Sequence, residues 1–111
     1  MTVTELTQAL ALEILNSADF DENISGCYIG DLLSLVMSRA QQGQAWLTVQ
    51  TNLNIIAVAV LTEVSCVIVV EQMEVGEETI AKAREQGVTL LRSPLPAYEL
   101  ALALSSLLNQ K

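Results

Sequence analysis

The sequence predicts an α/β fold, with a mostly parallel sheet made of βαβ units and helices packed on its faces. From residue 45 onward, strand-like and helix-like segments alternate at lengths typical of right-handed parallel crossovers. Val67–Val70 has no polar side, as expected of a strand that is covered on both faces. The 111 residues, 51% of them apolar, suffice for one domain, 1–111, with its own core.

The N-terminal segment predicts a short helix and then a short strand. Thr2 and Glu5 have the spacing of a capping box, so a helix is expected to begin after Thr2. Leu12–Leu15 either continues this helix or forms a short strand, and we favour the strand, which the turn-forming residues at 16–19 would follow. The acidic segment 19–23 is interpreted as a solvated loop, because it lacks the Gly and Glu positions of a calcium-binding loop.

A second helix is expected to begin at Asp31, a favourable N-cap residue, and to reach Ala40. Gly43 would then close it in a left-handed conformation. Before this helix, Gly26–Gly30 is interpreted as a loop or a short strand. Its two glycines permit a tight backbone approach.

The remaining chain repeats strand and helix. Gly87 is expected to close one helix, and Ser93 to cap the last one with Pro94 in its first turn. The expected strands are 45–49, 66–70 and 88–91, and the expected helices are 53–62, 77–86 and 95–109.

The segment expected to form the helix at 53–62 is apolar on every side. Its β-branched residues also permit a strand, but no turn would then separate it from the next strand, which favours a helix. A helix without a polar face must be buried on more than one side, so we predict a homodimer. Alternatively, the helix at 95–109 covers this segment within one chain. The interface candidates are Ile55, Ile56, Val58, Ala59 and Tyr28.

Charge and composition exclude several classes of partner. Five Lys and Arg against thirteen Asp and Glu give a net charge of −8, which repels nucleic acid and anionic membranes. Glu5 and Glu13 interrupt the N-terminal stretch, which predicts a cytoplasmic protein. The sequence has no histidine, and Cys27 and Cys66 lack the spacing of metal ligands. We therefore expect no metal and no cofactor.

A ligand of a parallel sheet is expected in the crevice at the carboxyl ends of the strands, where helices begin. Arg92 could bind an anion at the start of the last helix, or it could pair with Glu71 or Glu99. Simple capping is the alternative role of the hydroxyl and amide side chains. The ligand-binding candidates are Thr51, Asn52, Glu71, Arg92 and Ser93, a set suited to a polar ligand such as a nucleotide.

A resemblance to a known family runs along nearly the whole chain. The sequence resembles a DRTGG domain, a module related to the N-terminal domain of HPr kinase/phosphorylase, and in particular the stand-alone members often encoded beside iron-only hydrogenase genes. The eponymous motif is absent, and Thr51–Asn54 stands in its place. The runs that carry the resemblance are 26–34, 36–40, 43–51, 54–59, 67–69, 77–83, 91–93 and 97–100.

The resemblance implies a regulatory role. In HPr kinase, phosphoryl transfer belongs to a separate domain with a Gly-x-x-x-x-Gly-Lys-[Ser/Thr] loop, and this sequence has no such run. We expect a non-catalytic regulatory or ligand-sensing module that dimerises, in anaerobic and hydrogenase-linked bacterial metabolism. Its partners would be a second copy, a small polar or nucleotide ligand, and a metabolic enzyme. The alternatives are an enzyme acting on a nucleotide or phosphorylated metabolite at the strand-end crevice, and a ligand-free scaffold.

Overall fold

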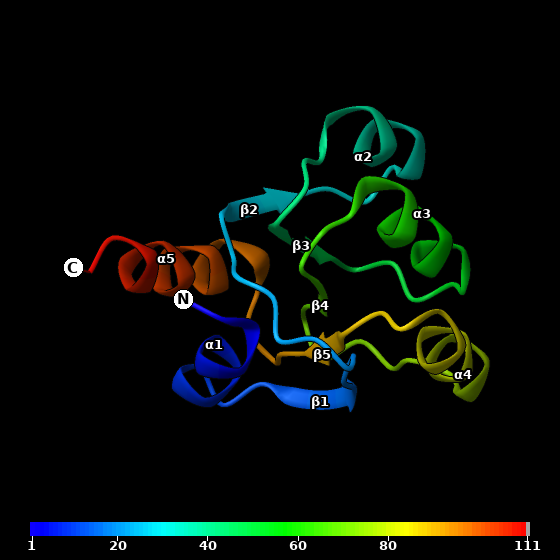
Figure 1. Ribbon diagram of the computed structural model, residues 1–111, viewed down its shortest axis with the longest axis horizontal. Helices are drawn as coiled ribbons and strands as arrows, with labels where there is room; N and C mark the ends of the chain where they lie inside the picture. Colours follow the sequence, from blue (N-terminus) through cyan, green and yellow to red (C-terminus); the bar gives the residue numbers. More distant parts are fainter. Residues whose placement is uncertain (111) are drawn as a thin grey trace.

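The computed structural model describes residues 1–110, which fold into a five-stranded sheet between two layers of helices (Figure 1). The strands are β1 (Glu13–Asn16), β2 (Gly26–Ile29), β3 (Gln44–Thr48), β4 (Cys66–Val69) and β5 (Leu90–Arg92). The helices are α1 (Val3–Ala9), α2 (Leu33–Arg39), α3 (Asn54–Thr62), α4 (Glu77–Gln86) and α5 (Ala97–Leu108). The α/β fold class predicted from the sequence is confirmed.

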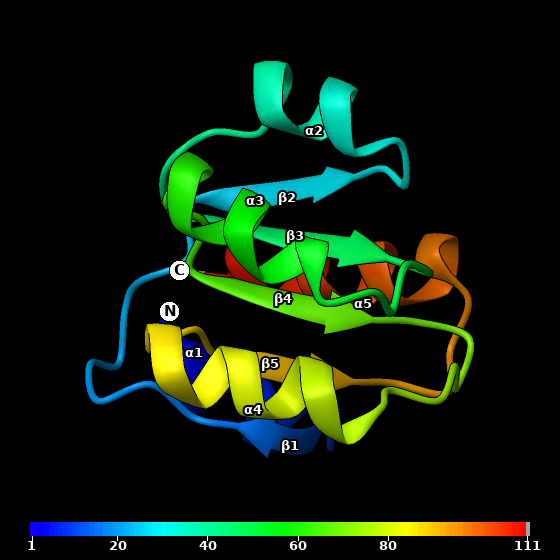
Figure 2. The ribbon, with the colours of Figure 1, turned by 90° about the vertical axis from the view of Figure 1, so that its right-hand side faces the viewer.

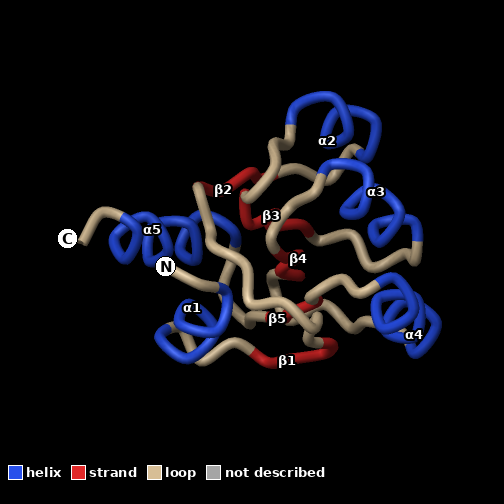
Figure 3. Tube along the Cα trace, in the orientation of Figure 1, coloured by secondary structure: helices blue, strands red, loops and turns tan. Residues whose placement is uncertain are grey.

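The strand order explains where each helix lies. The order in the sheet is β1-β5-β4-β3-β2; β2 to β5 are parallel neighbours in chain order, and β1 joins β5 antiparallel. Three successive crossovers in one direction place α2, α3 and α4 on the same face, since each crossover has the same hand. The opposite face is covered by α1 and α5 (Figures 1 and 3).

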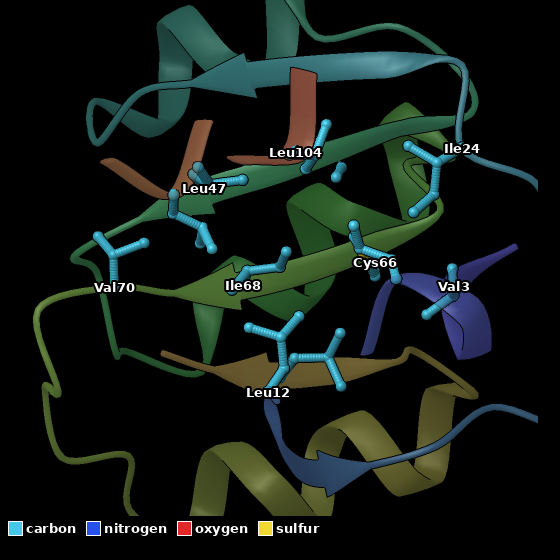
Figure 4. Packing of buried hydrophobic residues seen from close by; sticks show 12 residues of the cluster. Val3, Leu12, Ile24, Leu47, Cys66, Ile68, Val70 and Leu104 are labelled. Carbon is cyan, nitrogen blue, oxygen red and sulfur yellow. The ribbon is translucent and has the colours of Figure 1, made fainter. Parts of the chain in front are cut away.

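Each face of the sheet has its own apolar core. Successive side chains of a strand point to opposite faces, so β4 sends Cys66 and Ile68 toward α1 and α5, and Val67 and Val69 toward the crossover helices. Figure 4 shows the first of these cores, in which Ile68 and Cys66 lie close to Leu12. The unbroken apolar run of β4 therefore reflects burial on both sides, as the sequence predicted.

The N-terminal elements agree with the sequence prediction, and the structure decides the form of the segment Gly26–Ile29. The Thr2 side chain accepts a hydrogen bond from the Glu5 N–H and the Glu5 carboxylate accepts one from the Thr2 N–H, which confirms the capping box. The strand expected at Leu12–Leu15 is present as β1, one residue later. Gly26–Ile29, which the sequence left open as a loop or a short strand, is the edge strand β2.

Two helix starts were predicted wrongly, because side chains expected to cap them bond elsewhere. Asp31 is not the N-cap of α2; the helix follows Leu32, and Asp31 bonds to the loop after β3. Ser93 does not cap α5, which begins only after Pro96. Gly43 has the left-handed backbone expected of it (φ 85°) but lies beyond the end of α2, in the turn into β3.

The central segment is a helix, as predicted, and its sheet side is covered by its own chain. Ile55 and Ile56 are fully buried, and Val58 and Ala59 nearly so, between the sheet and the flanking helices α2 and α4. These four interface candidates therefore have no surface left for a second copy. Tyr28 packs its ring beside Gly30 and belongs to the same core. The alternative cover, α5, lies on the other face of the sheet, so it does not cover α3 (Figure 1).

One helix end carries backbone strain that a single substitution can relieve. Glu63 ends α3 in the left-handed conformation (φ 58°), where Gly87 ends α4 (φ 69°). Glu63→Gly should raise the free energy of unfolding by about 0.5–1 kcal/mol, because glycine adopts this conformation without a Cβ penalty. Urea unfolding measures the change. Gly87→Ala is the matched control and should lower stability by a similar amount; a stability loss in Glu63→Gly would contradict the assignment.

Candidate functional site

The carboxyl ends of the four parallel strands meet at one end of the sheet, which we call the carboxyl edge (Figure 2). It is formed by the loops 30–32, 49–53, 70–76 and 93–96, each of which leads from a strand to a helix. All five ligand-binding candidates lie in these loops or at the last residue of β5. Their local contacts decide which of them remain available to a ligand.

Asp31 ties the first two loops of the carboxyl edge together. Its Oδ1 accepts hydrogen bonds from the Thr48 hydroxyl (2.8 Å) and the Val49 N–H (2.9 Å). The Gln50 side-chain amide donates to the Asp31 carbonyl (3.0 Å). Sequence reasoning assigned Asp31 to helix capping and missed this role, because the partners come from the end of β3 and the loop after it, 17 to 19 residues away.

Thr51 and Asn52 lie between β3 and the first turn of α3. The Asn52 Oδ1 accepts a hydrogen bond from the Asn54 N–H (2.9 Å), and the N-cap residue of α3 is Leu53, which makes no side-chain capping bond. The Thr51 carbonyl accepts from the Thr79 hydroxyl (2.8 Å), which fastens this loop to α4. The Asn52 side chain is exposed and Thr51 is half-buried, so both can still reach solvent at this edge.

The loop after β4 holds two non-glycine residues in the left-handed region. Glu71 has φ 63° and Gln72 has φ 54°, and such residues cost about 1–3 kcal/mol each. The Glu71 N–H bonds to the Leu95 carbonyl and the Gln72 N–H to the Ser93 carbonyl, both at 3.0 Å. The strained loop is thus locked to the loop after β5, and the Glu71 carboxylate is left exposed.

Arg92 and Ser93 are engaged within the chain. The Arg92 guanidinium donates through Nε (2.9 Å) and Nη2 (2.7 Å) to Glu13 and through Nη1 to the Met73 carbonyl (3.3 Å). Its ionic partner is therefore Glu13 on β1, rather than Glu71 or Glu99. Ser93 is 2% exposed, and its hydroxyl accepts from the Leu95 N–H. The carboxyl edge consequently offers a ligand Thr51, Asn52 and Glu71 more readily than Arg92 or Ser93.

Three hollows in the described chain lie away from the carboxyl edge. One of about 360 Å³ lies at the opposite end of the sheet, where α3 and α4 end, and is lined by Glu63, Gly87 and the exposed Phe20 among others. Another of about 280 Å³ lies beside α1 and β1, and one of about 430 Å³ lies along β2 and α5. Sequence reasoning identified none of them, because each is lined by residues distant in the chain.

The thiols are the titratable groups most affected by burial. Burial raises the pKa of the Cys27 thiol from 9.0 to about 11 and that of the Cys66 thiol to about 12. Both thiols are therefore protonated at neutral pH, which disfavours nucleophilic or metal-binding roles. Backbone N–H donors lower the pKa of Glu5 and of Asp21 near the start of α1.

Residues 1–110 contain neither a cluster of metal-ligating side chains nor an apolar helix of membrane-spanning length. No group of three or more Cys, Asp or Glu side chains in this part of the chain is placed to hold a metal ion. No helix among the same residues has the length and apolar character needed to cross a bilayer.

Comparison with known proteins adds a structural likeness. No protein-family model matches the sequence, and no curated protein matches it. A solved structure of the CBS and DRTGG domains of the regulatory region of Clostridium perfringens pyrophosphatase, complexed with the activator diadenosine tetraphosphate, matches with a TM-score of 0.72 and 15% identity. The match covers 91% of this chain and 44% of that chain, so this chain spans less than half of its neighbour. At this identity the likeness concerns the fold, and it supports a DRTGG-like fold.

Removal of the Asp31 carboxylate should weaken the carboxyl edge. Asp31→Ala leaves the Thr48 hydroxyl and the Val49 N–H without their acceptor, and we expect a loss of about 2 kcal/mol in the free energy of unfolding. Chemical denaturation measures it. Asp19→Ala, in the exposed loop, is the control and should change stability by less than about 0.5 kcal/mol. Equal effects of both substitutions would contradict a structural role of Asp31.

The two thiols predict a loss of stability in alkali. Their pKa values in the folded protein, about 11 and about 12, exceed the ordinary value of 9.0, so the folded state keeps protons that the unfolded state releases. Their stabilising contribution is complete below pH 9 and declines as the pH rises toward 12. Unfolding free energies measured between pH 8 and 11 test this, and the decline should be shallower in Cys66→Ala. An identical pH slope in both proteins would contradict it.

Proposed function

We propose that this chain is a cytoplasmic, non-catalytic regulatory module that dimerises and senses a small polar or nucleotide ligand. The observation that carries the proposal is the likeness to a regulatory region over 91% of the chain. That neighbour was solved with a nucleotide activator, diadenosine tetraphosphate. The DRTGG resemblance extends the proposal to anaerobic, hydrogenase-linked metabolism with a metabolic enzyme as partner.

The carboxyl edge, with Thr51, Asn52 and Glu71, is the proposed ligand site. The first turns of α3, α4 and α5 all lie at this edge, and a helix N-terminus favours negative charge (Figure 2). Of these three, α3 has no acidic residue in its first turn, whereas α4 has Glu77 and Glu78 and α5 has Glu99. A phosphate-bearing ligand would therefore be placed at the start of α3, beside Thr51 and Asn52.

The strained loop supports the same location. Left-handed non-glycine residues persist where the surrounding structure holds them, and they cluster at ligand sites. Glu71 and Gln72 stand in such a loop, which follows β4, the neighbour of the strand β3 that leads to α3. A ligand that releases or tightens this loop would change the conformation of the protein, and a partner enzyme could respond to that change.

Thermal unfolding in the presence of nucleotides tests the ligand-sensing role. Diadenosine tetraphosphate, ATP and inorganic phosphate are the probes, and a bound nucleotide at a hundred times its Kd should stabilise the fold by about 2.7 kcal/mol. Asn52→Asp keeps the side-chain acceptor for Asn54 but adds a negative charge, so we expect affinity for a phosphorylated ligand to fall at least about tenfold.

A control variant and a turnover assay distinguish nucleotide sensing from the alternative functions. Asn109→Asp makes the same change at the far end of α5 and should leave nucleotide binding unaltered. Chromatography of the nucleotide after incubation separates binding from turnover. Product formation would support an enzyme, and no stabilisation by any probe would contradict nucleotide sensing and leave the scaffold alternative.

A further inference from the structure

The outward side of α3 is an unusual surface for a chain of net charge −8. The sheet side of this helix is buried, but Leu53, Ala57, Val60 and Leu61 are exposed on its outer side. We call these four residues the α3 stripe. Residues 53–62 contain no charged side chain, whereas α4 beside it carries Glu77, Glu78, Lys82, Arg84 and Glu85. In Figure 2 the stripe's helix lies in front of the sheet, between α2 and α4, with no other element over it.

We propose that a second copy of this chain packs on the α3 stripe, with the two α3 helices antiparallel about a twofold axis at Ala57. This rests on the dimerisation included in the proposed function and assigns it a surface. The four α3 residues predicted earlier for the interface face inward, and the stripe is the opposite side of the same helix.

The stripe is complementary to itself. Leu53, Ala57 and Leu61 are spaced four residues apart, so they form one ridge of the helix surface of the kind that packs into the groove of a neighbouring helix. A twofold axis at the central Ala57 brings Leu53 of each copy opposite the partner's Leu61. The small Ala57 permits close approach at the axis, and the larger leucines fill the space on either side.

The absence of charge favours a second copy as the occupant. Two molecules of net charge −8 repel each other, so a contact between them must avoid burying carboxylates. The α3 stripe meets this requirement over its whole length. Thr62 bonds back to the Val58 carbonyl, so its hydroxyl is satisfied within the helix and adds no unpaired donor.

The exposed area fits a reversible dimer. The exposed fractions are 39% for Leu53, 45% for Val60, 67% for Leu61 and 47% for Met37 on the adjacent α2. At roughly 120 Å² for a fully exposed aliphatic side chain, a pair of copies buries on the order of 500 Å² before the polar flanks are added. This is well below the roughly 1,200 Å² of a stable interface, so we expect a weak dimer that forms only as the protein concentration rises.

Charge exchange across the twofold axis tests the arrangement. Leu61→Glu places two carboxylates in the contact and should raise the dimer Kd at least about tenfold, while the exposed position leaves the fold intact. Adding Leu53→Lys to the same chain should restore the dimer, because each lysine then faces the partner's glutamate. A rescue of this kind cannot arise within one chain, where the two positions are eight residues apart on the helix.

Light scattering and sedimentation over a range of protein concentrations give the mass, and circular dichroism confirms folding of each variant. Leu102→Glu is the matched control, since Leu102 is 52% exposed on α5 at the other face of the sheet. The proposal expects a wild-type dimer, a Leu61→Glu monomer, rescue in the double variant and no effect in the control.

Each contrary result overturns the proposal without touching nucleotide sensing. A wild-type protein that stays monomeric to about 1 mM excludes the second copy and leaves the stripe to a different protein. A dimer that survives Leu61→Glu but dissociates in Leu102→Glu moves the interface to the α5 face. In either case a nucleotide that raises the melting temperature would still support the ligand-sensing part of the proposed function.

Discussion

Burial of the sheet on both faces is the constraint on which the rest of the structure depends. The central strand β4 has no exposed residue, and its neighbours β3 and β5 are nearly as well covered. Strands of three to five residues give little apolar surface each, so both faces must be covered to make a core. Three crossover helices supply one layer and the two terminal helices supply the other. The ends of the chain are therefore part of the core, through residues such as Leu6 and Leu104.

The same constraint explains why one helix carries two proposed roles. The middle crossover helix, α3, lies over the centre of the sheet, so its inner side is the most deeply buried of the crossover layer. The outer side of α3 is also apolar, although covering the sheet requires apolar residues only on the inner side. Its first turn lies at the carboxyl edge, beside Asn52. A change in the packing of α3 would thus affect the proposed ligand site and the proposed dimer contact together, which is a simple physical route from ligand to assembly.

The likeness to a pyrophosphatase regulatory region concerns the fold of this chain and only part of the neighbouring structure. The chain spans 44% of that neighbour. The carboxyl edge of this chain is held by bonds between loops, such as Asp31 with Val49 and Glu71 with Leu95. Arg92, which the sequence suggested for anion binding, instead joins β5 to β1 through Glu13. An anion at this edge would therefore depend on helix N-termini and neutral side chains more than on a free cation.

The sequence by itself determined the fold class, the helices after residue 50 apart from the start of α5, and the capping box at Thr2. These follow from local periodicity and from side chains that bond to their own neighbours in sequence. The tertiary structure alone decided the partners of Asp31 and Arg92, since both bond to residues distant in the chain. It also decided which side of α3 is exposed. A helix that is apolar all round gives no periodic signal of its inner side, so only the packing of the sheet against Ile55 and Ile56 leaves Leu53, Ala57 and Leu61 facing outward.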